Sequence, residues 1–406
     1  MTRTGEPMRP AAGGERPERW LVLVAAIVAQ ATFSAAYFGL PSIGSEIAAA
    51  DDLTLGEVGL VLSAPLFGML LSVAAVGIAA DRYGERIVIG GGLGLAALAL
   101  LGASTAEGPA ALSAWLVLAG VFGATAAIGG RAAAAWFSDA NRAFAVSARQ
   151  SAPMLGAAAG ALVLPAVAVA LSVGQTFVAL AIGCGVGALI AVVFLRRPPG
   201  VERAASGSRP GMRTVLGNRA VVALAGAAGL LQLTGVSLIA FTSILLVQER
   251  GWSVGAAGVL LAGALFGSAI GRVVSGRLAT PDRDHARLIR TITLAAALAT
   301  GVLAITTAAV GWLIPAAAVV AIVLATSGNG VSAGAVSERV PLALVGTALG
   351  VRMTVTLSAN AIAPVGFGVL LGATGWSVGL ALLVVPAVAA AAVLSLPALA
   401  TRPEPA

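Results

Sequence analysis

Four arginines interrupt long apolar stretches of this sequence, at Arg131, Arg149, Arg272 and Arg352. A guanidinium group is planar and permanently charged, and it binds carboxylate or phosphate through two parallel hydrogen bonds. Placing such a charge inside a membrane costs several kcal/mol, so we expect these side chains to face protein or water rather than lipid. The residue type and its setting therefore predict a site that binds an anion.

Each arginine also has a structural alternative, which the sequence leaves open. These alternatives are that Arg131 reaches back to the water layer, that Arg272 bonds a helix end or the segment around Asp282, that Arg352 pairs with Asp81, and that Arg149 pairs with Asp139 or Glu338.

Uncharged polar side chains at similar depth form a second set of candidates: Gln30, Tyr37, Gln232 and Asn360. Gln30 and Gln232 are 202 positions apart, and Arg149 and Arg352 are 203 positions apart. Near-equal separations indicate two similar halves, each contributing one arginine and one glutamine to a central site. The alternatives are hydrogen bonds between helices and, for Asn360, a bond to backbone freed by Pro364.

Other kinds of chemistry find little support. The 17 acidic residues lie in connections, tails or at the ends of apolar stretches, which argues against a simple buried-carboxylate relay for protons. Coupling through a substrate carboxyl group or through an acid at a helix end, such as Glu57, stays open. One histidine and one cysteine, far apart, cannot form a zinc site or a Cys/His nucleophile pair. We therefore expect neither an enzyme nor a metal or cofactor.

The composition indicates an integral membrane protein. Of 406 residues, 59% are hydrophobic and 10% are charged, whereas soluble domains are about 25% charged. These values exclude a typical soluble enzyme and a disordered chain. The net charge of +7 does not indicate nucleic-acid binding, because the arginines recur between apolar runs instead of clustering on one solvated face.

Twelve apolar stretches are each long enough to cross about 30 Å of hydrocarbon as a helix. We expect helices rather than barrel strands, since the stretches are apolar all round and do not alternate. The stretches are 20–41, 56–79, 87–104, 110–136, 143–170, 174–195, 219–247, 254–279, 287–308, 312–335, 343–371 and 377–399.

The arginines outside these stretches predict orientation. They concentrate at the chain ends and in alternate connections, whereas the opposite connections carry only Arg250. The positive-inside rule then places both termini in the cytoplasm and the chain in the cytoplasmic membrane. The predicted organisation is a tail over 1–19, a six-helix bundle over 20–195, a basic Pro/Gly-rich linker over 196–218, a second bundle over 219–399 and a tail over 400–406.

The connection after the second stretch reads Gly77-Ile-Ala-Ala-Asp81-Arg82-Tyr-Gly84-Glu85-Arg86. This segment resembles the loop signature of the major facilitator superfamily, roughly G-x-x-x-D-R-x-G-R-R, and departs from it at Glu85. The resemblance implies that Gly77, Asp81, Arg82, Gly84 and Arg86 belong to a loop that latches the two halves in one conformation. A weaker copy containing Asp282 follows the eighth stretch.

The resemblance implies an all-α membrane protein with twelve transmembrane helices in two pseudo-symmetric six-helix bundles, working by alternating access. In that family the helices that carry the four arginines line the central cavity. We therefore expect Arg149 and Arg352 to hold a small organic or inorganic anion, with help from Gln30 and Gln232. The lipid bilayer is the other expected partner, a proton or counter-substrate is a possible coupling ion, and the expected state is a monomer.

The segment from Arg142 to Gly156 looks like the fifth helix of uptake-type members that carry cyanate, nitrate or organic anions. It lacks the Gly-Pro dipeptide typical of drug–proton antiporters. The alternative function is efflux of an apolar or cationic compound, in which case the arginines are structural. A cationic-drug site would usually contain a buried acid, which the sequence does not show.

Overall fold

The computed structural model describes residues 18–128, 136–137, 139–196, 211–279, 284–309, 313–341 and 344–400, and all regular structure in these ranges is helical. At positions 81, 128, 139–147, 150, 398 and 400 only the backbone is described. The predicted site residue Arg131 and the loop residue Asp282 lie outside the described residues, as does the side chain of Asp81.

The described part of the first half of the chain contains ten helical elements. They are α1 (Glu18–Ser34), the π-helix η1 (Ala35–Gly39), the 3₁₀ helix η2 (Leu40–Ile43), α2 (Gly44–Ala50), α3 (Leu55–Tyr83), α4 (Glu85–Ala103), α5 (Gly108–Gly123), the 3₁₀ helix η3 (Ala124–Ile128), α7 (Asp139–Ala170) and α8 (Val173–Phe194).

The second half has the same character. Its elements are α9 (Met212–Gly217), α10 (Arg219–Ile244), the π-helix η4 (Leu245–Glu249), α11 (Val254–Leu278), α12 (His285–Ala309), α13 (Ile314–Ser327), α14 (Asn329–Ser337), α15 (Val345–Leu382), α16 (Val384–Val393) and α17 (Pro397–Ala400). The short helix α9 falls inside the predicted linker 196–218, where the sequence suggested no helix. Its Val215 is fully buried, which anchors this turn against the bundle.

Within the described residues, eleven helical segments are long and apolar enough to cross a membrane. Ten of them each correspond to one predicted stretch, so the membrane class and the helical fold are confirmed. The first continues through η1, η2 and α2 to Ala50, well beyond the predicted end at 41. In α7 the apolar span begins at Ser151 instead of 143, so Arg149 lies two residues before it.

The eleventh segment, Val345–Val393, covers the last two predicted stretches. A straight helix of 49 residues would be about 74 Å long, more than twice the thickness of the hydrocarbon layer. The backbone leaves the helical conformation at Gly375, and contacts with α12 show that the chain reverses there. Ser377 lies beside Thr307 at one end of α12, whereas Ser395 lies beside Arg290 near the other end.

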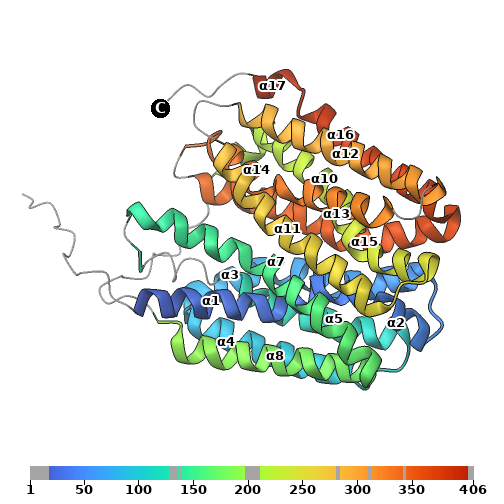
Figure 1. Cartoon of the computed structure of the whole chain (residues 1–406). Coiled ribbons are helices and arrows are strands. Elements are labelled where there is room, and N and C mark those ends of the chain that lie inside the picture. The colour runs from blue at the N-terminus through green and yellow to red at the C-terminus, as the bar shows by residue number, and fades with distance from the viewer. Residues whose placement is uncertain are drawn as a thin grey trace, which may run out of the picture.

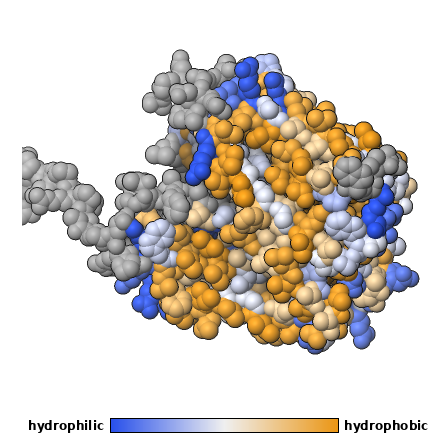
Figure 2. Space-filling view, in the orientation of Figure 1, coloured by the Kyte–Doolittle hydropathy of each residue, from blue (hydrophilic) through white to orange (hydrophobic). Residues whose placement is uncertain are grey.

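The helices form two groups that lie one above the other in the view of Figure 1, with α1–α8 below and α10–α16 above. The main contacts between the groups are α3 with α15 and α7 with α11. Figure 2 shows hydrophobic residues across the middle of this face and hydrophilic residues mainly toward its two ends. That distribution is typical of helices that cross a bilayer along their length.

The two halves approach closely toward one end of these paired helices. A methyl group at Gly59 of α3 would collide with the Pro364 carbonyl of α15, and Ser63 of α3 accepts a hydrogen bond from the Val365 N–H at 3.1 Å. On the other side, a methyl group at Gly258 of α11 would lie 2.5 Å from the Ala161 carbonyl oxygen of α7. Only glycine permits backbones to approach so closely, so these contacts close this end of the interface.

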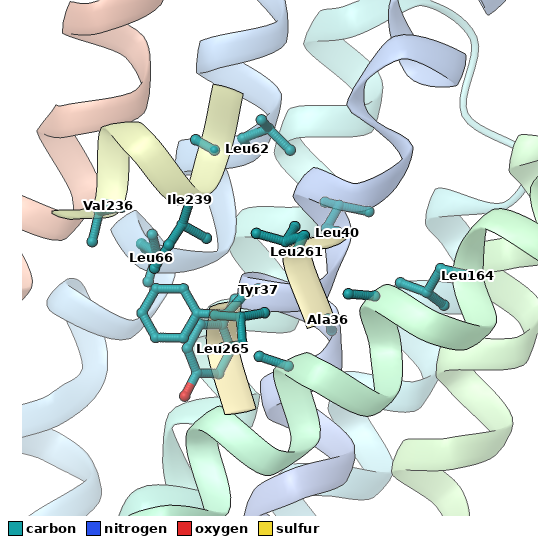
Figure 3. Close-up of a cluster of buried hydrophobic side chains, with 14 of the residues drawn as sticks. Ala36, Tyr37, Leu40, Leu62, Leu66, Leu164, Val236, Ile239, Leu261 and Leu265 are labelled. Atoms are coloured by element: carbon teal, nitrogen blue, oxygen red, sulfur yellow. The ribbon is translucent and has the colours of Figure 1, made fainter. Parts of the chain in front are cut away.

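Next to these contacts lies a cluster of buried apolar side chains from both halves, which we call the interbundle seal (Figure 3). The seal consists of Ala36, Tyr37, Leu40, Leu62, Leu66 and Leu164 from the first half and Val236, Ile239, Leu261 and Leu265 from the second. Tyr37 lies at its edge, and its hydroxyl oxygen points out of the cluster. The seal therefore ends where polar side chains begin.

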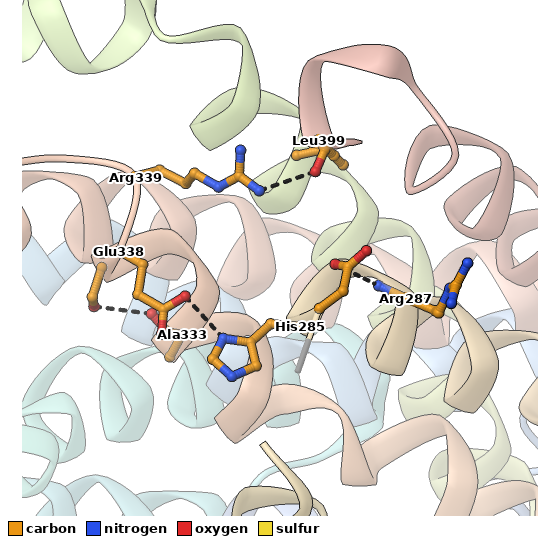
Figure 4. A network of polar contacts seen from close by, with 8 residues as sticks. His285, Arg287, Ala333, Glu338, Arg339 and Leu399 are labelled. Atoms are coloured by element: carbon orange, nitrogen blue, oxygen red, sulfur yellow. Dashed lines mark hydrogen bonds and ion pairs between the residues drawn. The ribbon is translucent and has the colours of Figure 1, made fainter. Parts of the chain in front are cut away.

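A separate polar network holds one end of the second half together (Figure 4). His285 at the start of α12 bonds Glu338 after α14, with 2.9 Å between Nδ1 and the carboxylate oxygen. Arg339 donates to the Leu399 carbonyl oxygen at 3.0 Å. These contacts join α12, α14 and α17, and they engage the Glu338 carboxylate, one of the two partners considered for Arg149.

Candidate functional site

Arg149 is a buried arginine that binds a helix end in the first half. Its Nη2 donates to the carbonyl oxygens of Ala126 at 3.1 Å and Ala127 at 2.6 Å, and to Gln30 Oε1 at 3.3 Å. The two carbonyls belong to η3, where α5 tightens and ends, and helix ends leave carbonyls without backbone partners. The Arg149 Nε is buried and has no partner. This side chain therefore satisfies a helix end while keeping part of its donor capacity.

Gln30 connects Arg149 to Tyr37. The Gln30 Nε2 donates to Ser34 Oγ at 3.3 Å and to the Tyr37 hydroxyl at 3.5 Å, and the Ser34 and Tyr37 oxygens are 3.0 Å apart. Tyr37 belongs to η1, a π-turn that widens the first membrane segment, and such turns are frequent at functional sites. The first half thus carries a buried polar chain from Arg149 to the edge of the interbundle seal.

The second half contains a similar chain that starts at Arg352. The Arg352 Nη2 donates to the Asn329 carbonyl at 2.8 Å and to Asn329 Oδ1 at 3.0 Å, and Nε donates to Ser332 Oγ at 2.8 Å. Asn329 Nδ2 donates to Gln232 Oε1 at 3.0 Å, and Gln232 Nε2 donates to Asn360 Oδ1 at 2.9 Å. Arg352, Gln232 and Asn360 are therefore brought together.

The two arginines follow the same rule of spacing. Each donates to a backbone carbonyl 23 residues earlier in the chain, Arg149 to Ala126 and Arg352 to Asn329. In both halves that carbonyl lies at a helix discontinuity, η3 after α5 in the first and the boundary between α13 and α14 in the second. A repeated contact at equal spacing agrees with the interpretation of the sequence as two related halves.

Arg272 of α11 is less engaged than the other two arginines. Its Nε donates to the Thr326 carbonyl at 3.3 Å, near the end of α13, while its two terminal nitrogens make no hydrogen bond within the described part of the chain. Arg272 lies close enough to Arg352 and to the Tyr37 hydroxyl to interact with both electrostatically. Arg272 therefore lies between the polar chain of its own half and the tyrosine of the other half. Its bond to Thr326 agrees with the helix-end alternative considered from the sequence.

Negative charge near these arginines is sparse. Among the residues that the structure describes, no carboxylate forms an ion pair with Arg149, Arg272 or Arg352. Glu85 at the start of α4 is buried and its charge acts on Arg149. Glu85 is the position at which the loop motif departs from the family signature, and this departure places an acid near a buried arginine. Glu57, a sequence candidate for coupling, instead accepts hydrogen bonds from Thr54 in a capping box at the start of α3.

The remaining loop residues of the motif are accounted for more simply. Gly84 joins α3 to α4 with φ 91° and ψ 147°, a conformation that only glycine adopts readily. Arg82 lies over the Tyr83 ring at 5.4 Å, and Arg86 is exposed. The latch role of Gly77, Asp81, Arg82, Gly84, Arg86 and Asp282 stays a prediction.

Sequence reasoning missed Ser332 and Thr326, which bind Arg352 and Arg272. A signal was present: Gly328-Asn329-Gly330 lies inside the predicted stretch 312–335, and a pair of glycines there is a helix breaker. For Gln30 and Gln232, the structure shows the hydrogen-bonding role that was considered alongside substrate binding.

Comparison with known proteins places this geometry in context. The sequence model of the Major Facilitator Superfamily matches residues 22–364. Uncharacterized MFS-type transporters from two Mycobacterium tuberculosis strains, CDC 1551 / Oshkosh and ATCC 25618 / H37Rv, are each 29% identical over 356 residues, which cover 87% of this chain and 79% of theirs.

Solved structures share the fold at low sequence identity. A bacterial homolog of the human lysosomal transporter Spinster, in an inward-facing and unoccupied conformation, aligns with TM-score 0.78 and 17% identity over 97% of this chain and 100% of its own. The nucleoside transporter NupG aligns with TM-score 0.76 and 14% identity over 92% and 98% of the two chains. A D-xylose–proton symporter aligns with TM-score 0.71 and 15% identity over 93% of this chain and 96% of its own.

Proposed function

Because the chain belongs to the Major Facilitator Superfamily, we propose that it is a secondary transporter that carries a small anion across the cytoplasmic membrane by alternating access. The observation that carries this proposal is the arginine group. Arg149 and Arg352 each belong to one of the two amide chains, Arg272 and Arg352 are anchored at the same helix break, and no described carboxylate forms an ion pair with any of the three. A site with this charge attracts anions and repels cations.

The donors that remain free identify the groups that would bind the anion. Arg272 keeps both terminal nitrogens free of described partners, Arg352 keeps its Nη1, and Arg149 keeps its Nε and Nη1. We assign the main contacts to Arg272, which has the most free donors, and to Arg352, whose anchoring carbonyl lies three residues from that of Arg272. Arg149 is less favoured because it is anchored in its own half and lies in the field of the buried Glu85. Arg149, Gln30, Gln232 and Asn360 complete the site and fix its geometry.

The expected architecture is twelve spans in two pseudo-symmetric bundles, 20–195 and 219–399. The reversal at Gly375 supports counting the segment Val345–Val393 as two spans, since each part is then long enough to cross the membrane once. The 196–218 linker, with the tails 1–19 and 400–406, then lies in the cytoplasm, as the arginine distribution suggests. The proposed transporter acts as a monomer.

The conformation is inferred to be inward-facing. The contacts at Gly59 and Gly258 close the end of the interface opposite to the proposed cytoplasmic side. Substrate would reach the arginines from the cytoplasmic side in this state. Rocking of the two bundles would separate the interbundle seal and expose the same site to the outside.

Efflux of a cationic compound is the less favoured function, because a cation would meet three positive charges, of which only Arg149 has a described carboxylate, Glu85, in its surroundings. An apolar cargo would gain nothing from the arginines. The source of energy is a gradient of the substrate itself, of a counter-substrate or of protons.

The test is ligand-dependent thermal stability of the detergent-purified protein, followed by uptake into proteoliposomes. A ligand at 100 times its Kd stabilises the folded state by about 2.7 kcal/mol. We expect stabilisation by small carboxylates or inorganic anions, and loss of that stabilisation in Arg272→Gln and Arg352→Gln. The control is Arg277→Gln, which removes an exposed arginine from the same helix as Arg272. Stabilisation by hydrophobic cations alone would refute the proposal.

A further inference from the structure

Two of the three arginines come from the same half and share one anchoring point. Arg272 donates to the Thr326 carbonyl, and Arg352 donates to the Asn329 carbonyl. These carbonyls are three positions apart and flank Ser327 and Gly328, where α13 ends and α14 begins. Helices from opposite sides, α11 and α15, thus bring one guanidinium each to the same helix break.

The anchoring fixes how far apart the two charges are. Three helical residues correspond to a rise of about 4.5 Å, so with hydrogen bonds of 3.3 and 2.8 Å the two bonding nitrogens lie roughly 11 Å apart at most. The Arg272 charge acts directly on Arg352, which is consistent with this proximity. Two like charges are therefore held side by side. Arg272 commits one nitrogen to protein atoms and Arg352 commits two.

The third arginine differs in its electrostatic surroundings. Arg149 receives the field of the buried Glu85 and donates three hydrogen bonds from one nitrogen. Arg272 and Arg352 have no such acidic neighbour among the described residues, and Arg352 is additionally repelled by Arg272. The two arginines without a described acidic neighbour therefore both belong to the second half.

We propose that the site selects a doubly charged anion, with one negative charge neutralised by Arg272 and the other by Arg352. This inference rests on the proposed function and narrows its substrate class. A monoanion would neutralise one guanidinium and leave the other uncompensated beside it, whereas a dianion removes the repulsion between them. The Tyr37 hydroxyl donates to Ser34 in this conformation, because Ser34 Oγ already donates to the Gln30 carbonyl, so the two arginines carry the recognition of charge.

Two kinds of ligand share this chemistry: a short dicarboxylate, which gives one carboxylate to each arginine, and a phosphate-like ion, which lies between them. Both are recognised by guanidinium groups through paired N–H···O bonds. The experiment therefore includes one arm for each.

The measurement is the Kd of purified, detergent-solubilised full-length protein at pH 7.5 for a matched pair of probes, succinate and succinamate. These probes have nearly the same size and differ by one charge. We expect succinate to bind at least tenfold more tightly. Sulfate serves as the compact dianion, and tighter binding of sulfate than of succinate assigns the site to phosphate-like ions within the same proposal.

Variants connect the charge preference to the two arginines. In Arg272→Gln and in Arg352→Gln, the ratio of the two Kd values should fall to about one, because one guanidinium remains. Arg272→Lys keeps the charge and should keep most of the preference, so it distinguishes loss of charge from loss of folding. Arg277→Gln on the same helix should leave the ratio unchanged.

Three results would count against the inference or its premise. Equal binding of succinate and succinamate by the unmodified protein, or a preference that persists in both Gln variants, would overturn the dianion site and leave an anion transporter standing. Binding of no anion of either charge, with the protein folded and hydrophobic cations bound, would overturn the proposed function itself.

Discussion

Replacing Gly258 by alanine should weaken the closed end of the interface between the two halves. Gly258 of α11 lies against α7, where an added methyl group would lie 2.5 Å from the Ala161 carbonyl oxygen and 2.7 Å from Pro165 Cγ. Ordinary contact begins at 3.4 Å, so the helices must separate by about 0.9 Å. Since the obstructing atoms belong largely to backbone and a proline ring, side-chain rotation cannot relieve the clash.

The size of the effect follows from the cost of overpacking. An extra methyl group in a well-packed interface costs about 1–3 kcal/mol. If the clash exists only in the inward-facing state, this cost shifts the equilibrium toward the outward-facing state by roughly 5- to 150-fold. The gain in helix propensity from glycine to alanine, about 1 kcal/mol, is common to both states and does not change their ratio.

The assay is the rate at which a thiol inside the interbundle seal reacts with a water-soluble maleimide. Ala36→Cys places the thiol at a position that is 1% exposed and visible within the seal in Figure 3. The native Cys184 is fully buried in α8 and gives the background rate. We expect the Ala36→Cys reaction to accelerate about tenfold when Gly258→Ala is added, because the thiol reacts only when the seal is open.

Gly263→Ala is the matched control. It lies on the same helix, and an added methyl group there meets nothing within 4 Å. If the Ala36→Cys thiol reacts at the same rate when combined with Gly258→Ala as with Gly263→Ala, the argument that the α7–α11 contact holds this end closed is refuted. A lower rate in Gly258→Ala would mean that the contact tightens instead of opening.

Three further outcomes follow from individual contacts. Arg149→Gln should lower thermal stability by about 1–3 kcal/mol, since the carbonyls of the buried Ala126 and the half-buried Ala127 lose their donor; thermal melting of the purified variant checks this. Asn329→Asp should weaken anion binding at least tenfold, because the new carboxylate pairs with Arg352, whereas Asn329→Ala should weaken it less; titration of both variants distinguishes them. Gly84→Ala should destabilise the protein by about 1–3 kcal/mol in melting experiments, because its φ of 91° strains any residue with a side chain.

The membrane spans could be predicted from the sequence because each depends on one local property, about twenty apolar residues in a row. The features that were missed depend on a single residue or on a tertiary contact. The reversal at Gly375 requires a backbone conformation that hydropathy does not report. The helix α9 forms because Val215 is buried against the bundle, although its composition is that of a linker.

The candidate site was predictable in its residue types and not in its contacts. Arginines within apolar stretches are costly, so their positions already indicated a role. Which atoms they bind depends on helix rotation and on breaks such as Gly328, and neither follows from apolar length. Arg149 and Arg352 were expected to share one ligand, whereas each is first bonded to a carbonyl within its own half.

These contacts explain how the same residue type serves two purposes at one site. A break in a membrane helix leaves carbonyls that cannot bond water, and an arginine has five N–H donors to satisfy them. An arginine that uses one nitrogen in this way remains positioned, charged and able to bind an anion with the others. Arg272 commits only its Nε, so it retains the most free donors of the three. The number of free donors therefore favours Arg272 as the group that meets the substrate. Arg352 has one free nitrogen and joins Arg272 because both are anchored at the same helix break, whereas Arg149 lies in the field of Glu85.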